Sequence, residues 1–126
     1  MAEPGGVGTF NWNELATSDA AKCKEFYTKL FGWTAIDKPM GPMTYTIFQH
    51  EGRDVGGMMQ MGPEWGNIPS HWMSYVHVAD CDAAAKRLTE LGGKVCVPPT
   101  DIPNVGRFAV VSDPSGATFS IIKMNR

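Results

Sequence analysis

Apolar and polar positions change period along the chain, and the changes mark strands and helices. Residues 20–31 and about 81–91 carry apolar side chains at helical spacing, and stretches rich in β-branched and aromatic residues lie on either side of each. Asp19 and Asp80 stand where an N-cap is expected, and glycines stand where each helix should end. Each half of the chain is therefore predicted to run strand, helix, then three strands.

The strands of the first half are predicted at residues 9–16, 33–36, 44–50 and 55–61, and those of the second at 72–78, 94–97, 107–112 and 117–123. Prolines mark the expected breaks. Pro39 to Pro42 should separate two strands of the first half, and Pro98-Pro99 should end a strand of the second.

The two halves repeat one another, because a shift of 61 residues places Asp19 on Asp80 and Gly32 on Gly93. We expect one domain, 1–126, with module 1 at about 8–61, a connector at 62–69 and module 2 at about 70–124. The predicted class is α+β, with two βαβββ modules forming a cupped, open mixed β-barrel and the helices outside. Such a cup is a natural site for a small molecule.

Composition argues against nucleic-acid binding and against a membrane-spanning helix. A net charge of -2 provides no basic footprint for nucleic acid, and no apolar run approaches the ~20 residues of a membrane helix. Three cysteines without a C-x-x-C pair favour reduced thiols in the cytoplasm. Cys81 is expected in the first turn of a helix, where a thiol pKa can fall, although a plain packing role is favoured. Residues 1–6 are expected to be a flexible lead-in rather than a signal peptide.

Strand alternation selects the candidate cup residues. Trp12 and Glu14 share one face of the first strand, and Tyr75 and His77 share one face of the strand that opens module 2. Glu14 is the strongest single candidate, as a hydrogen-bond acceptor or general base in the cup. A salt bridge at the solvent-exposed edge of the strand, or across an interface, is the equally weighted alternative. His77 could pair with Glu14 or orient a ligand, and a structural role is favoured. Tyr75 could bind a ligand or pack in the core.

Other residues complete the predicted ligand-binding set. Tyr45 could stack on a ligand or pack at the rim. Flexible methionines suit a bulky hydrophobic or aromatic ligand, and core filling is the alternative for Met58, Met59 and Met73. Arg107 could hold an anionic group, although a solvated arginine is favoured.

Three segments together resemble a known family. They are similar to the two helices and the "DPDGN" turn of the glyoxalase I, bleomycin-resistance and extradiol-dioxygenase group, the vicinal oxygen chelate superfamily. The first helix is matched by Asp19 with the run from Glu25 to Trp33, and the second by Val76 to Asp80 followed by Leu91-Gly92-Gly93. The turn is matched by Asp113 to Ala117. The resemblance covers about residues 9–124. It implies the fold of two βαβββ modules predicted above, and it implies a homodimer.

The resemblance also implies four metal-ligand positions, which metal-binding members fill with histidine and glutamate. In this sequence they fall on Trp12, Met73, Ser120 and Met59, or on Met58 if the strand slips by one. Indole is not a ligand, and a thioether suits hard divalent ions poorly. We therefore expect no metal and no cofactor, and we add Ser120 to the ligand-binding set.

Three functions follow. The first is a glyoxalase/bleomycin-resistance-like protein that binds a small hydrophobic or aromatic molecule in the cup without a metal. The second is a lyase or isomerase of the same family that uses Glu14 as acid/base. The third is a structural or regulatory module without a ligand.

Overall fold

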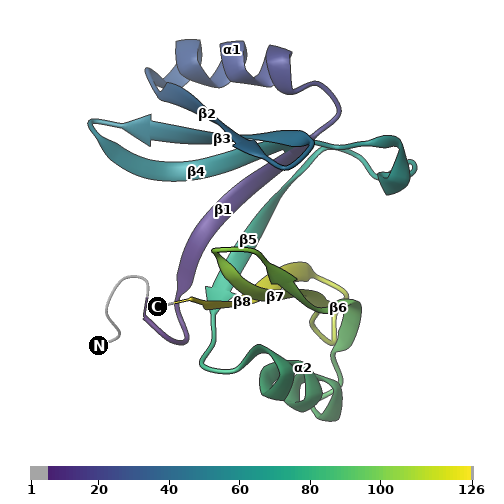
Figure 1. Cartoon of the computed structure of the whole chain (residues 1–126). Coiled ribbons are helices and arrows are strands. Elements are labelled where there is room, and N and C mark those ends of the chain that lie inside the picture. The colour runs from purple at the N-terminus through teal and green to yellow at the C-terminus, as the bar shows by residue number, and fades with distance from the viewer. Residues whose placement is uncertain (1–5, 126) are drawn as a thin grey trace. The chain divides into compact units, whose positions relative to one another are not determined.

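The computed structural model describes residues 6–125, and the predicted lead-in falls almost wholly outside them. Its elements are drawn in Figure 1 and run in the order β1 (Phe10–Thr17), α1 (Ala20–Phe31), β2 (Thr34–Met40), β3 (Met43–His50), β4 (Arg53–Gln60), the 3-10 turn η1 (Pro63–Trp65), β5 (His71–His77), α2 (Cys81–Glu90), β6 (Lys94–Ile102), β7 (Gly106–Ser112) and β8 (Thr118–Met124). This order confirms the α+β class and the repeated βαβββ pattern.

The described chain divides into two compact units that each contain one helix. The α1 unit comprises residues 12–73, and the α2 unit comprises residues 6–11 and 74–125. The first described residues thus belong to the α2 unit. The Gly8 N–H donates to the His77 carbonyl over 2.7 Å, and the His77 N–H donates to the Thr9 carbonyl over 2.9 Å.

Each unit contains a mixed sheet with one helix packed on it. In the α1 unit the strand order is β2-β3-β4-β1, with β1 parallel to β4 and the other pairs antiparallel. In the α2 unit the order is β5-β8-β7-β6, with β5 parallel to β8. The duplication inferred from the sequence is therefore a duplication of topology.

The helices begin and end at the residues that mark them in the sequence. The Asp19 carboxylate accepts from the Lys22 N–H, and the Asp80 carboxylate accepts from the Ala83 N–H. Helix α1 stops at Gly32, whose φ of 71° lies in the left-handed region. No helix among the described residues is long and apolar enough to cross a membrane.

The proline breaks were predicted too early. Strand β2 continues through Pro39, and β6 continues through Pro98 and Pro99 to Ile102. Both strands lie at the end of their unit's strand order, where one side of the backbone needs no ladder hydrogen bond and a proline is tolerated. The register between β6 and β7 shifts twice around these prolines, which indicates bulges rather than a strand end.

Candidate functional site

The sheet face opposite α1 carries the polar side chains of the α1 unit. Leu15 is paired with Met58, and both belong to the core beneath α1. Their neighbours therefore point to the other face: Glu14 is paired with Gly57, and Met59 with Tyr45. The strand phase predicted for Glu14 is confirmed.

Three side chains form a directed hydrogen-bond chain on this face. The Trp12 Nε1–H donates to Tyr45 Oη over 2.8 Å, and Tyr45 Oη–H donates to Glu14 Oε2 over 2.8 Å. The direction is fixed, because an indole N–H can only donate and a phenol has a single proton. All three side chains are half-buried. Glu14 thus accepts a hydrogen bond from Tyr45, as one of its two predicted roles requires.

Gly57 makes this chain possible, and the sequence interpretation missed it. A Cβ built at Gly57 would lie 1.8 Å from Tyr45 Oη and 2.4 Å from Cζ of the same ring. The tyrosine therefore crosses β4 over the bare glycine backbone to reach Glu14 on β1. The Gly56-Gly57 pair within a strand was the available signal, because an interior strand glycine marks a close approach.

The α2 unit has its own polar face. Ala109 and Ile121 pack against α2, so Tyr75, His77 and Ser120 point to the other side. Tyr75 and His77 are each 8% exposed and Ser120 is 0% exposed. Tyr75 is the cross-strand neighbour of Ser120, and no described atom forms a hydrogen bond with Ser120 Oγ. The predicted pairing of Glu14 with His77 stays a prediction, since the two belong to different units.

Two predicted ligand residues lie elsewhere. Met58 is 1% exposed beneath α1, because the strand does not slip and Met59 takes the outward position. Arg107 lies on the α2 side of its sheet, where it forms ion pairs with Asp82 and Asp101 that raise its pKa. We remove Met58 and Arg107 from the candidate site. Met73 is half-buried in β5.

Cys81 is the first residue of α2, as expected, and it is 2% exposed. Burial, followed by the charge of Asp82, raises the pKa of its thiol. This favours the packing role over the reactive one.

The donor set does not fit the metal that the family resemblance implies. Trp12 uses its only N–H to donate to Tyr45, and Met59 and Met73 present thioethers. The described residues hold no group of three His, Cys, Asp or Glu side chains suited to a metal ion. We therefore derive no chemistry through a metal.

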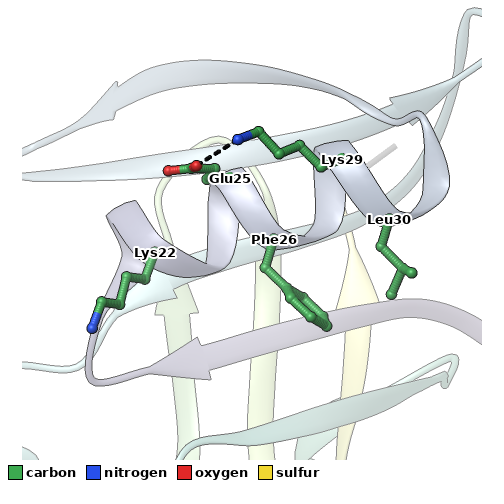
Figure 2. Close-up of a pocket in the computed structure, with 5 residues that line it drawn as sticks. All are labelled: Lys22, Glu25, Phe26, Lys29 and Leu30. Atoms are coloured by element: carbon green, nitrogen blue, oxygen red, sulfur yellow. Dashed lines mark hydrogen bonds and ion pairs between the residues drawn. The ribbon is translucent and has the colours of Figure 1, made fainter.

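Helix α1 also has an exposed flank. The predicted apolar stripe splits: Tyr27 packs on Trp33 and Phe48, whereas Phe26 and Leu30 are 56% and 58% exposed. Figure 2 shows Phe26 and Leu30 projecting from one side of the helix, and the Glu25–Lys29 ion pair on another. We call Lys22, Glu25, Phe26, Lys29 and Leu30 the α1 flank.

Known proteins resemble the chain over most of its length. It is 40% identical over 118 residues to "Putative glyoxylase CFP32" of Mycobacterium tuberculosis, an alignment that covers 93% of this chain and 44% of that protein. It is 35% identical over 123 residues to "Anthracycline biosynthesis protein DauV" of Streptomyces sp. (strain C5), covering 87% of this chain and 45% of that protein. The chain thus spans less than half the length of these curated relatives.

Solved structures agree in fold. Methylmalonyl-CoA epimerase from Mycobacterium tuberculosis matches with a TM-score of 0.66 at 13% identity, covering 96% of this chain and 93% of that one. The Streptomyces coelicolor epimerase in complex with 2-nitronate-propionyl-CoA gives 0.67 at 15% identity, covering 96% and 100%. Identities this low show the fold alone. The model of the Glyoxalase/Bleomycin resistance protein/Dioxygenase superfamily matches residues 9–121, and the chain belongs to this family.

Proposed function

We propose that the chain binds a small planar, hydrophobic or aromatic molecule on the sheet face of the α1 unit opposite α1, without a metal. The observation that carries this is the Trp12–Tyr45–Glu14 hydrogen-bond chain, which fixes two aromatic side chains and a carboxylate on one half-buried face. Such a mixture of apolar surface and a few placed polar groups is typical of small-molecule sites. DauV, named for anthracycline biosynthesis, supports an aromatic ligand class.

The test is calorimetric titration of the full chain with a panel of planar aromatic molecules. Trp12→Phe removes the first donor of the hydrogen-bond chain. It should weaken binding by about tenfold, because Tyr45 is then no longer held by Trp12. Trp65→Phe is the matched control, because Trp65 lies in η1 and is not a member of the Trp12–Tyr45–Glu14 hydrogen-bond chain. Absence of binding by every panel member, or equal loss in both variants, would overturn the proposal and favour a structural module.

Catalysis by Glu14 is the second candidate, and the bond from Tyr45 favours it. A carboxylate oriented by the Tyr45 hydroxyl can act as a general base for a proton next to a carbonyl. Turnover of a bound carbonyl compound by the wild type, and its loss in Glu14→Gln with binding retained, would establish this function. Binding without turnover leaves the protein a binder.

A further inference from the structure

We infer that the aromatic ligand of this site carries an anionic group of the carboxylate type, and that Lys38 binds this group. The inference names the ligand class of the proposed function and therefore rests on that function. It follows from the place of Lys38, which is a cation on the same sheet face as Tyr45 with apolar side chains on either side of it.

Strand β2 divides its side chains between the two faces of the sheet. Ala35 packs against the core beneath α1, and Asp37 forms an ion pair with Lys24 of that helix. Because successive residues of a strand point to opposite faces, Lys38 points away from α1. Its cross-strand neighbour on β3 is Tyr45, so Lys38 and the candidate site share one face.

The side chains beside Lys38 on this face are apolar. On β2 they are those of Ile36 and Met40, each two residues from the lysine. The pairing with β3 places Ile47 opposite Ile36 and Met43 opposite Met40. Four aliphatic side chains therefore flank one ammonium group, which is the arrangement that an apolar molecule with a negative charge requires.

The charge of Lys38 has no counterpart on its own hairpin face. Asp37 is the one acidic residue in the sequence from 34 to 50, and it belongs to the opposite face. None of the ion pairs described within residues 6–125 includes Lys38. By contrast, Lys24 pairs with Asp37, and Lys29 of the α1 flank pairs with Glu25.

Glu14 is too far from Lys38 to repel an anion bound there. In the order β2-β3-β4-β1 the two residues lie on the first and the last strand, three spacings or about 14 Å apart at ~4.8 Å each. Surface charges at such a separation are largely screened at physiological ionic strength, where the Debye length is about 8 Å. The face can therefore bind a negative group at its β2 edge although it carries a carboxylate on β1.

These positions give the ligand a direction on the face. An aromatic ring packed on Tyr45 has Lys38 on its β2 side and β4 on its other side. A carboxylate on the β2 side of the ring forms a charge-assisted hydrogen bond with the ammonium, whereas a cationic substituent there would meet a like charge.

Calorimetric titration of the full chain with 2-naphthoate and 2-naphthamide tests the inference, because the two molecules have the same shape and differ in charge. We expect naphthoate to bind about fivefold more tightly at about 50 mM salt, and the preference to shrink at about 500 mM. Equal binding at low salt, or tighter binding of naphthamide, would overturn the inference and leave the proposed function intact. Failure of both to bind would overturn the proposed function and the inference with it.

Three variants test whether Lys38 is the group that binds the anion. Lys38→Gln removes the charge, so naphthoate and naphthamide should bind equally, and Lys38→Arg keeps the charge and should keep the preference. Lys94→Gln is the matched control, because Lys94 is a lysine of β6, the edge strand of the α2 unit. A preference that survives Lys38→Gln, or that is lost to the same extent in Lys94→Gln, would overturn the assignment.

Discussion

The two units follow the same order of strands and helix, but their cores contain different kinds of side chain. Beneath α1, the rings of Tyr27, Trp33 and Phe48 lie 5.3–5.9 Å apart, and the helix contributes no fully buried residue. Beneath α2, the small residues Cys81 and Ala85 are buried. Large rings fill the space between helix and sheet in one unit, and small helix residues do so in the other. The duplication has kept caps and topology, not core composition.

The faces opposite the helices differ as well. In the α1 unit the polar atoms of Trp12, Tyr45 and Glu14 satisfy one another. In the α2 unit Ser120 Oγ is buried, and no described atom is bonded to it. A satisfied polar chain holds its members in place, whereas an unsatisfied hydroxyl costs free energy. We therefore place the candidate site on the sheet face of the α1 unit.

The largest expected effect distinguishes the two cores. Phe48 is 0% exposed and packs on two other rings, so Phe48→Ala should lower the free energy of unfolding by about 3–5 kcal/mol. Val111, also 0% exposed, loses two methyl groups in Val111→Ala, which should cost about 2 kcal/mol. Urea denaturation followed by circular dichroism measures both. Equal losses would mean that the Phe48 ring contributes less than its burial predicts.

A smaller effect on stability, but a larger one on the site, is expected from Gly57→Ala. The new Cβ would overlap the Tyr45 ring, so the tyrosine must leave Glu14. We expect a cost of about 1–3 kcal/mol in the free energy of unfolding and weaker binding of the planar aromatic panel. Gly56→Ala is the control, because its Cβ meets Asn13 O at 3.1 Å and leaves Tyr45 untouched. A Gly57→Ala variant with unchanged affinity for the panel would show that the Tyr45–Glu14 hydrogen bond does not contribute to ligand binding.

Much of the fold could be predicted from the sequence, because its signals are local. The N-caps Asp19 and Asp80 and the stop at Gly32 act within one turn of the chain, and helix α1 was predicted with its observed bounds. The strands β2 and β6 were predicted too short, since a proline is compatible with a strand only at a sheet edge. Which strand is an edge depends on pairing between distant residues, and that is not a local property.

The candidate site was predicted in part. Alternation along one strand gave the faces of Trp12 and Glu14. The choice between Met58 and Met59 needed the register of β4 against β1, and a shift of one residue exchanges the two faces. Gly57 was missed because its role is to have no side chain. The missing side chain becomes important only once Tyr45 is known to cross the strand at this residue. Arg107 was misassigned because its acidic partners are 25 and 6 residues away.

The smallest expected effect is on the free energy of unfolding at low pH. It compares one carboxylate in the α1 unit with one in the α2 unit. Each helix is tied to its sheet by one carboxylate: the Lys24 ammonium, followed by the Thr46 hydroxyl, lowers the pKa of Asp37, and the Arg107 guanidinium lowers the pKa of Asp82. A carboxyl with a folded pKa below its ordinary value of 3.8 contributes stability above that pH, and the contribution is lost as the pH falls through the folded pKa.

Removing each cation should therefore have unequal results. In Arg107→Gln, Asp82 loses the donor that chiefly lowers its pKa, so that pKa should return to the ordinary range and the acid-side loss of stability due to this group should disappear. In Lys24→Gln, the pKa of Asp37 should rise only part of the way, because Thr46 still donates to its other oxygen over 2.7 Å. Carboxyl titration by NMR measures both pKa values. Because both carboxylates are exposed, water screens the two ion pairs and the change in stability should be small. A full return of the Asp37 pKa in Lys24→Gln would show that the hydroxyl contributes nothing, and the two helix anchors would then be equivalent.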